Sequence, residues 1–432
     1  MSRLALFGGT PIRTRPFPSW PIFDEREEKA VIQLMRGGKW WHYSFGAGSG
    51  HADPTADLSG SKLVEFQEAF AKMQGAKYGI ACANGTGALE VALKALGVGP
   101  GDEVIVPAYS FIATASAVLM VNAIPIFVDI DYDTFNLDPP RVEEAITPKT
   151  KAIVPVHFAG QAADMDALMA IAKRHTLAVL EDAAHAHGAT WNGEGLGTIG
   201  SLGTFSFQVS KNMTAGEGGV ILTGDPDLAA LCESYIWGGR EIGRPWYEHH
   251  RLGWNYRMTE FQGAILLQQL ARLPEQNAKR MQNASYLAAR LAKIPGISSL
   301  TIPGFVTKHS YHIFMFRFQE TEFGITRKDF LLALEKEGIP CSSGYAHPLY
   351  KNPVFLNQNF YPQGCPVNCE HSNRTLDYGS FSELCPNVER ACREAVWLEH
   401  RLLLAEQSDM EQIVEAVGKI YECRQELART AV

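Results

Sequence analysis

Residues 78–107 read YGIACANGTGALEVALKALGVGPGDEVIVP and contain the repeating unit of the fold. A short apolar run covers 78–83, a helical pattern covers 86–96, and a second apolar run covers 103–107. Apolar runs of this length, bounded by turn residues, are typical of buried strands. The stretch therefore predicts two strands separated by a helix.

The same alternation continues to about residue 225. Further apolar runs cover 124–128, 152–156 and 177–181, and helical patterns lie near 112–121 and 165–174. Continuous apolar runs separated by helices indicate a mostly parallel sheet with helices on both faces, so the predicted fold class is α/β. In such sheets ligands bind beyond the carboxyl ends of the strands. The residues that follow each run are therefore the candidates for a functional site.

A long helical pattern follows this part of the chain. It starts near Thr259, runs through Arg272 and extends to Ala292. A break is expected around Pro274, because proline lacks an amide donor and clashes with the preceding turn. We expect this helix to connect two domains.

The remaining segments predict a smaller domain and an N-terminal arm. After the long helix, a strand, a helix and a final amphipathic helix are expected over 312–318, 327–337 and 410–427. These elements fit a smaller α+β domain over 271–432, next to an arm and a large domain over 1–270. The first 30 residues are rich in proline and aromatic side chains and predict an ordered arm. A helix that Asp24 caps is expected near its end.

The composition argues against several classes of protein. The 432-residue chain has a formal net charge of −8 and 46% hydrophobic residues, as ordinary globular proteins do. It has no basic run interleaved with aromatic residues, so nucleic acid is not the expected partner. It also lacks an apolar run of the roughly 18 residues that span a membrane. Residues 1–9 lack the apolar stretch of a signal peptide, so we expect a cytoplasmic protein.

Four of the eight cysteines fall between 365 and 392, close to His371. Their spacings, Cys365-x3-Cys369 and Cys385-x6-Cys392, match no strong zinc pattern. We therefore expect reduced thiols and no metal.

Asn84-Gly85-Thr86-Gly87 directly follows one apolar run and directly precedes a helix. Free amides at the start of a helix, with glycines that allow close approach, form an anion site that suits a phosphate. The alternative is a tight turn in which Thr86 is the N-cap of the helix.

Asp182 lies where an apolar run ends, and His185 and His187 follow it. A carboxylate buried there needs a cationic partner, and the protonated pyridine nitrogen of a cofactor would be one. The alternative is an aspartate that caps the next helix. The two histidines are two residues apart and cannot share a helix face. A metal held by both is therefore not expected, and one of them is expected to be structural.

Lys211 lies in SFQVSKNMTAGEGG, residues 206–219, between an apolar run and a glycine-rich turn. A lone lysine is usually a solvated surface residue. Here an anion cradle, a candidate pyridinium partner and a lysine follow one another, each at a predicted strand end. Desolvation lowers the pKa of a lysine placed in this way and makes the amine nucleophilic.

Three stretches carry a resemblance to a known family. They are residues 83–114 (ANGTGALEVALKALGVGPGDEVIVPAYSFIAT), 181–189 (EDAAHAHGA) and 206–219. They resemble the DegT/DnrJ/StrS-type sugar aminotransferases, which are fold-type I pyridoxal-5′-phosphate enzymes, and the resemblance extends over about 60–420. It implies that Lys211 forms the Schiff base with the cofactor and shuttles the proton. It also implies that Asp182 pairs with the pyridine nitrogen and that His185 lies near the phenolic oxygen of the cofactor.

The resemblance also implies further cofactor contacts. Gly85, Thr86 and Ser206 would hold the phosphate, and Phe111 would stack on the ring. Asn255 would reach the phosphate of the other subunit, which makes the protein a homodimer with shared active sites. The alternatives are core packing for Phe111 and a turn position for Asn255.

The N-terminal stretches FGGTPIRTRPFPSWPIFDEREEKA and GGKWW resemble the branch of scyllo-inosose aminotransferases and 3-amino-5-hydroxybenzoate synthase. The resemblance implies transfer of an amino group from glutamate or glutamine to a keto-sugar or keto-cyclitol, as in aminocyclitol antibiotic biosynthesis. An aminodehydratase of the 3-amino-5-hydroxybenzoate synthase type and a nucleotide-sugar aminotransferase are the alternatives.

The substrate residues follow from the same branch. Trp40 or Trp41 would line the mouth of the pocket, and His347 would bind a hydroxyl group. The alternative is that both tryptophans anchor the arm. Residues 42–60 and 360–385 read as insertions relative to the family and leave the exact substrate open.

Overall fold

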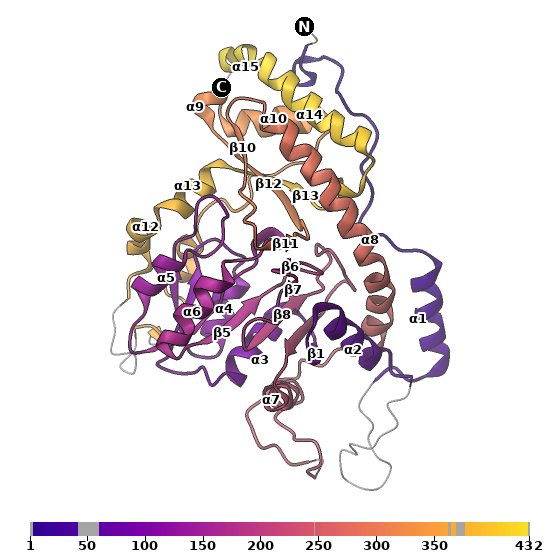
Figure 1. Cartoon of the computed structure of the whole chain (residues 1–432), viewed down its shortest axis with the longest axis vertical. Helices are drawn as coiled ribbons and strands as arrows, with labels where there is room; N and C mark the ends of the chain where they lie inside the picture. Colours follow the sequence, from indigo (N-terminus) through magenta and orange to yellow (C-terminus); the bar gives the residue numbers. More distant parts are fainter. Residues whose placement is uncertain (1–2, 42–59, 246, 362–363, 369–375, 431–432) are drawn as a thin grey trace.

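A central sheet forms the large lower part of the molecule (Figure 1). The structure is a computed structural model that describes residues 3–41, 60–245, 247–361, 364–368 and 376–430. Within these residues, seven strands lie in the order β1-β9-β8-β5-β4-β2-β3. β9 is antiparallel to β1 and β8, and the other neighbouring pairs are parallel. The strands are β1 (Tyr78–Cys82), β2 (Glu103–Pro107), β3 (Ile124–Val128), β4 (Thr150–Ile153), β5 (Ala178–Asp182), β8 (Leu202–Ser206) and β9 (Gly219–Thr223).

Both faces of this sheet are buried. Along β9, Val220 and Leu222 belong to one hydrophobic cluster, whereas Ile221 between them belongs to another. Since successive side chains of a strand point to opposite faces, apolar layers cover the sheet on both sides, as predicted. The helices of this part are α2 (Lys62–Gln74), α3 (Gly85–Ala95), α4 (Ala113–Met120), α5 (Pro139–Ala145), α6 (Met165–His175) and α7 (Pro226–Ile236).

A smaller antiparallel sheet lies in the upper part, together with both chain ends (Figure 1). Its strands are β10 (Ile297–Ser299), β12 (Ile313–Phe318) and β13 (Ala395–Glu399), and β6 (Thr190–Trp191), β7 (Glu194–Gly195) and β11 (Val306–Lys308) form a third sheet. The later helices are α9 (Glu320–Phe323), α10 (Arg327–Lys336), α11 (Pro353–Leu356), α12 (Phe381–Leu384), α13 (Pro386–Glu394), α14 (Gln407–Glu422) and α15 (Arg424–Thr430). The predicted α/β class with a mostly parallel sheet is confirmed.

Helix α8 (Glu260–Leu291) connects the lower and upper parts (Figure 1). The predicted break around Pro274 is wrong, because the helix continues through this residue. Side chains on either side of the proline are held by other elements. Gln269 donates to Glu27 Oε1 (2.7 Å), and Asn277 donates to the carbonyl oxygen of His187 (2.8 Å). These tertiary contacts offset the cost of an interior proline.

The predicted division into 1–270 and 271–432 stays a prediction. Its boundary falls inside α8. Aromatic rings of the segment that follows residue 349 pack against Phe127 of β3, which belongs to the central sheet. This segment therefore adds to the core of the lower part of the molecule.

The N-terminal arm is ordered as predicted and packs on the C-terminal elements. Leu4 and Phe17 are buried. Arg13 pairs with Asp409 at 2.7 Å, and its amide donates to the carbonyl oxygen of Glu337 at 3.0 Å. Helix α1 (Glu25–Gly37) follows, with Asp24 as its N-cap. Among the described residues, no helix is long and apolar enough to cross a membrane.

Candidate active site

One cavity brings together most of the predicted cofactor residues. It has a volume of about 790 Å³ and lies at the carboxyl ends of β1, β2, β5 and β8. Its lining includes every predicted cofactor residue of this chain except Asn255, namely Gly85, Thr86, Phe111, Asp182, His185, Ser206 and Lys211. This edge of the sheet is where parallel α/β folds bind their ligands.

The start of α3 forms the anion cradle. Asn84, not Thr86, is the N-cap, and its side chain accepts a hydrogen bond from the Gly87 amide at 2.8 Å. The alternative role of Thr86 as the cap is therefore wrong. Among the hydrogen bonds of the described residues, the Gly85 and Thr86 amides have no partner, so they remain available to an anion.

Gly85 is required by close packing against the other half of the cradle. A Cβ on Gly85 would lie 2.7 Å from the Cβ of Ser206. A larger residue would therefore separate the start of α3 from the end of β8. The hydroxyl of Ser206 and the free amides of α3 consequently border the same part of the cavity.

Asp182 is a buried carboxylate that has no cationic partner within hydrogen-bonding distance among the described residues. It is 5% exposed and accepts hydrogen bonds from Thr114 Oγ1 (2.8 Å) and from the Ala184 amide (3.2 Å). No helix follows it, so the helix-cap alternative is wrong. Burial raises the pKa of this carboxyl group. A cation at the open end of the carboxylate would stabilise its charged form.

His185 borders the cavity. Its Nδ1 accepts a hydrogen bond from the Ala159 amide at 3.3 Å, so a neutral ring carries its proton on Nε2. Burial lowers the pKa of His185 well below its usual value. Ala159 adopts a left-handed backbone conformation (φ 56°), which is strained for a residue with a side chain. The strained residue, Ala159, is therefore the same residue whose amide fixes the tautomer of His185.

His187 has a structural environment, which fits the expectation that one of the two histidines is structural. It is fully buried, and its Nε2 lies 2.9 Å from the carbonyl oxygen of Ser206. Its ring packs among Phe70, Phe205 and Phe207.

Lys211 borders the cavity from the turn that follows β8. Desolvation lowers the pKa of its ammonium group to about 8, and the Asp182 charge opposes part of this shift. Lys211 is partly exposed because it faces the cavity. Protein atoms still surround most of its ammonium group, and this desolvation lowers the pKa. An amine with this pKa is neutral far more often near pH 8 than an ordinary lysine, which makes it a better nucleophile.

Phe111 is 58% exposed and lines the cavity, so core packing does not explain its position. The other predicted residues do not line this cavity. Asn255 is exposed and forms a single bridge with Trp237. Trp40 and Trp41 are 50% and 40% exposed and lie near the start of α8, where the Glu260 amide donates to the carbonyl oxygen of Trp40.

His347 lies on an exposed turn next to Pro348 and outside the cavity. Residues 42–59 of the first predicted insertion lie outside the described residues. The same is true of part of the second insertion, including Cys369 and His371. In the described part of the chain, no three His, Cys, Asp or Glu side chains are placed to hold a metal ion.

Sequence reasoning missed several residues of the site. Tyr345, Trp397 and His312 line the cavity, and the ring of His312 lies 4.2 Å from that of His185. An adjoining cavity of about 630 Å³ shares His312 and Trp397 with the first and extends to Trp20. The only available signal for His312 was its position at the start of a predicted strand. Nothing local in the sequence marks the other residues.

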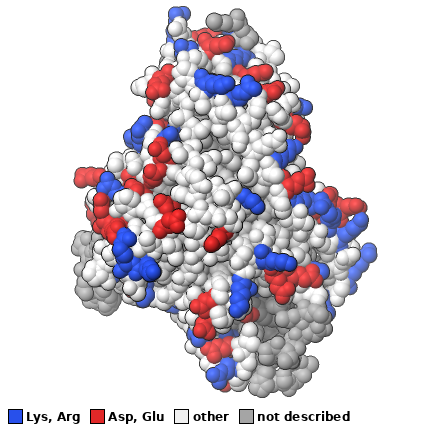
Figure 2. Space-filling model, viewed as in Figure 1, with Lys and Arg blue, Asp and Glu red and all other residues white. Residues whose placement is uncertain are grey.

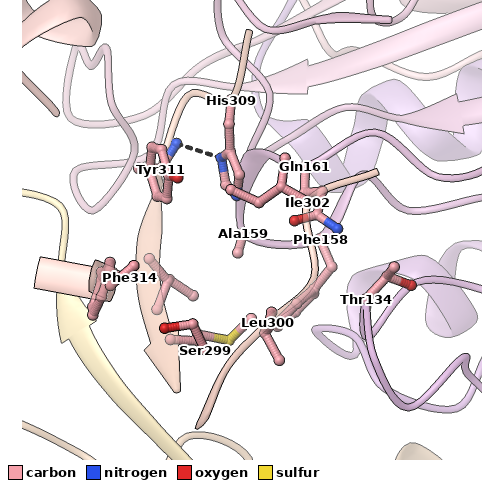
Figure 3. Close-up of a pocket in the computed structure, with 13 residues that line it drawn as sticks. Thr134, Phe158, Ala159, Gln161, Ser299, Leu300, Ile302, His309, Tyr311 and Phe314 are labelled. Atoms are coloured by element: carbon pink, nitrogen blue, oxygen red, sulfur yellow. Dashed lines mark hydrogen bonds between the residues drawn. The ribbon is translucent and has the colours of Figure 1, made fainter. Parts of the chain in front are cut away.

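Figure 3 shows a third cavity, whose lining includes Ala159, the residue whose amide bonds to His185. It has a volume of only about 30 Å³, between Ala159 and the stacked rings of His309 and Tyr311. The Tyr311 amide donates to His309 Nδ1 at 2.9 Å, which is the dashed contact in Figure 3. A space of this size holds one or two waters, so it cannot be the substrate site.

Charges on the visible face of the molecule are of mixed sign. Figure 2 shows acidic and basic side chains interspersed, with no broad basic patch on that face. This distribution does not favour a polyanionic partner on this face.

The residues of the large cavity fit a phosphorylated pyridine cofactor. Two free amides and a serine hydroxyl border one end of the cavity. A buried carboxylate that no described cation hydrogen-bonds and a lysine with a lowered pKa line the same cavity. A dianionic phosphate, a protonated ring nitrogen and a carbonyl carbon are the groups that these three features suit.

The chain is similar to one family of known proteins in sequence and in fold. The pattern of the DegT/DnrJ/EryC1/StrS aminotransferase family matches residues 54–396. An L-glutamine:2-deoxy-scyllo-inosose aminotransferase from Streptoalloteichus tenebrarius is 38% identical over 434 residues, covering 96% of this chain and 97% of that protein. A 3-amino-5-hydroxybenzoate synthase from Amycolatopsis mediterranei is 35% identical over 409 residues, covering 93% and 96%. The crystal structure of a 3-amino-5-hydroxybenzoic acid synthase matches with a TM-score of 0.83 and 34% identity, covering 95% of this chain and all of that one.

Proposed function

This chain belongs to the DegT/DnrJ/EryC1/StrS aminotransferase family of pyridoxal-phosphate enzymes, and from this premise we propose that it transfers an amino group from glutamine to a six-membered keto-cyclitol. The observation that carries the proposal is the single cavity that gathers the cradle of α3, Asp182 and Lys211. The relatives named for scyllo-inosose ketones match this chain over nearly its whole length. They support the choice of a cyclitol and of glutamine.

Each part of the cavity would bind a different part of the cofactor. Gly85 and Thr86 would donate their free amides to the phosphate, and Ser206 its hydroxyl group. Asp182 would hold a proton on the ring nitrogen. When bound, the cofactor supplies a ring that delocalises the electron pair left after a proton leaves the substrate carbon. Phe111 would cover one face of the ring.

Lys211 would move the proton. In the first half of the reaction, its Nζ would take the proton from the α-carbon of glutamine. In the second half, it would deliver a proton to the former carbonyl carbon of the ketone. A pKa of about 8 leaves roughly a quarter of the amine neutral at pH 7.5, compared with about 0.1% for a pKa of 10.5.

The adjoining cavity would receive the ketone ring. Trp20 and Trp397 border it with flat apolar faces, and Glu399 and Arg401 add polar groups that can bind hydroxyls. A ring with C–H faces and several hydroxyl groups suits this combination. His347 lies two residues from Tyr345 of the cavity lining and would meet a substrate that extends outward.

We infer that the protein acts as a homodimer in the cytoplasm. Asn255 is exposed and does not line the cavity of its own chain. Trp40 and Trp41 are also exposed, near the same end of α8. A two-fold dimer would bring all three to the cavity of the partner subunit, where Asn255 would reach the phosphate and the tryptophans the ketone.

An aminodehydratase is the second candidate. It is favoured by the similarity of the fold to that of 3-amino-5-hydroxybenzoic acid synthase. The two functions differ in their chemistry, because an aminodehydratase would expel water from a ring that already carries its amino group and would so form an aromatic ring.

The test is a panel of ketones with the full-length protein, its cofactor and glutamine. The panel contains scyllo-inosose, 2-deoxy-scyllo-inosose, an amino-cyclohexenone carboxylic acid and a nucleotide-linked 4-keto-sugar. Mass spectrometry identifies the products, and Lys211→Ala is the inactive control. Amino-cyclitol products are expected. An aromatic product would support the aminodehydratase, and amination of the nucleotide-linked sugar alone would refute the cyclitol proposal.

A further inference from the structure

Arg280 is buried in an unusual way. Its side chain is completely buried in α8 and, among the described residues, makes no ion pair with a carboxylate. Its guanidinium group donates to Asn277 Oδ1 at 2.9 Å and to His400 Nδ1 at 3.2 Å. The ring of Trp20 lies 5.7 Å from its central carbon. A buried charge without a counter-ion is costly, and burial lowers the pKa of Arg280 to about 9.

Arg280 determines which nitrogen of His400 carries the proton. A guanidinium group has only donors, so His400 Nδ1 must accept. The ring therefore carries its proton on Nε2, and this nitrogen lies 3.0 Å from the carbonyl oxygen of Ser210. Burial and the charge of Arg280 lower the pKa of His400 well below its usual value, so the ring stays neutral. His400 is consequently a fixed donor to Ser210.

Ser210 directly precedes Lys211 in the turn after β8. Within this turn, the amides of Ser210 and Lys211 bond to Gln208, at 2.8 Å to its side chain and 2.9 Å to its carbonyl oxygen. Among the described residues, the side chain of Asn212, next to Lys211, donates to the carbonyl oxygen of Ser310 at 2.7 Å, and two carbonyl oxygens of the turn accept bonds from outside it. His400 bonds to that of Ser210, and Trp20 donates to that of Val209 at 2.7 Å. The ring of Trp20 also packs edge-on against His400 at 4.5 Å.

The same part of α8 holds the other end of the segment. Asn277, which accepts from Arg280, donates to the carbonyl oxygen of His187 at 2.8 Å. His187 in turn lies 2.9 Å from the carbonyl oxygen of Ser206. Asn277 of α8 therefore holds His187, which contacts the carbonyl group of Ser206. Arg280 of α8 holds His400, which contacts the carbonyl group of Ser210.

We propose that Arg280 is a positioning residue for Lys211, because it holds His400 in the tautomer that anchors the Ser210 carbonyl group. A lysine reaches its target through a flexible four-carbon stem, so only its backbone fixes the starting point of that stem. The inference rests on the role of Lys211 given under Proposed function. The inference goes beyond that role because it assigns the placement of Lys211 to Arg280 of α8 and to His400, which follows β13.

Substitutions at both residues separate positioning from general stability. His400→Gln keeps an amide donor that reaches Ser210, whereas His400→Leu removes it. Arg280→Met removes the constraint on the tautomer. Asn283→Leu is the matched control, because Asn283 is buried one turn further along α8 and bonds to the carbonyl oxygens of Leu403 and Ala405 instead.

Two measurements are made on the full-length variants. The first is hydrogen exchange of residues 208–212 without cofactor. The second is the rate at which pyridoxal phosphate attaches to the lysine, followed by absorbance and by borohydride fixation. His400→Leu and Arg280→Met should speed exchange and slow attachment by about tenfold or more. The double variant should be no worse than either single variant, and His400→Gln should stay near the unmodified protein.

The inference is overturned if His400→Leu resembles His400→Gln, or if Asn283→Leu produces the same changes. If Arg280→Met does not fold, nitrogen NMR of the unmodified protein decides instead. A proton on His400 Nδ1 at neutral pH would refute the inference. If borohydride fixes the cofactor elsewhere than on Lys211, the proposed function fails. The exchange data still decide whether Arg280 and His400 hold the turn.

Discussion

Replacement of Asp182 by asparagine separates the role of its charge from its role in the fold. The substitution keeps the shape and removes the negative charge from a side chain that is 5% exposed. An asparagine oxygen can still accept from the Ala184 amide. The Thr114 hydroxyl can turn to accept from the new amide while it donates to Ser110 Oγ, 2.8 Å away. Local hydrogen bonding therefore survives.

The substitution should slow the reaction without lowering the stability of the cofactor-free protein. Burial disfavours the charged form of Asp182, as its raised pKa indicates, so a neutral amide should not destabilise the cofactor-free protein. Proton transfer should slow, because loss of one partner of a buried charge pair costs about 3–5 kcal/mol. At about 1.4 kcal/mol per decade, this cost corresponds to a loss of two to three and a half decades in rate.

The assay is the half-reaction with glutamine, followed by cofactor absorbance in a single turnover, with α-deuterated glutamine to report on the proton step. Asp129→Asn is the matched control. Asp129 is also a buried aspartate just beyond a strand end, but its oxygens accept from the backbone amides of Ile130, Asn387 and Val388. That control should lose stability and keep its rate. A rate for Asp182→Asn within a few-fold of the unmodified protein, or an equal loss in the control, would refute the role of Asp182.

Three further predictions concern Lys211, the dimer and the substrate. Because the pKa of Lys211 in the folded protein is about 8, below its usual 10.5, the unfolded chain binds more protons between these values. The free energy of unfolding of the cofactor-free protein, measured in urea, should therefore rise by up to about 3 kcal/mol from pH 8 to 10.5 relative to that of Lys211→Met. If the free energies of the two proteins changed with pH in parallel, the prediction would be contradicted. A mixture of inactive Lys211→Ala and Asn255→Ala chains should regain part of its activity, since mixed dimers carry one intact site; no recovery despite proven subunit exchange argues against a shared site. Trp40→Ala and Trp41→Ala should raise KM for the ketone several-fold and leave the glutamine half-reaction unchanged, and a slower half-reaction would assign the tryptophans to the cofactor instead.

The sequence predicted the elements that have a strong local pattern. The strands over 103–107 and 124–128 have the predicted bounds. The apolar run before Lys211, which forms β8, was predicted without bounds, and β9 was not predicted. β9 begins at Gly219, the last glycine of the turn after Lys211, and this overlap hides the start of the strand. The N-cap of α3 was misassigned because Asn84 and Thr86 are both good caps, and only the observed start of the helix selects Asn84.

The side chains that line the site were more predictable than those that support it. Asp182 and Lys211 follow directly after predicted strands, so their position at one sheet edge follows from the order of the elements. Thr114 contacts Asp182 although it lies 68 residues earlier in the chain. His400 contacts Ser210 although it lies 190 residues later. Such pairs require the three-dimensional arrangement, because no spacing within the sequence connects them.

The charges around the two cavities favour a neutral ring over a nucleotide-linked substrate. At the cofactor end, the Ser206 hydroxyl, the free amides of α3 and its helix dipole suit one phosphate. At the mouth, the lining residues that the structure describes include one arginine, Arg401, which pairs with Glu399 at 2.5 Å and donates to the carbonyl oxygen of Pro18 at 3.2 Å. A diphosphate placed there would have to displace Glu399, whose charge would repel it. A polyhydroxylated ring would instead donate hydrogen bonds to the Glu399 carboxylate and pack against the apolar faces of Trp20 and Trp397. The ion pair between Glu399 and Arg401 would stay intact.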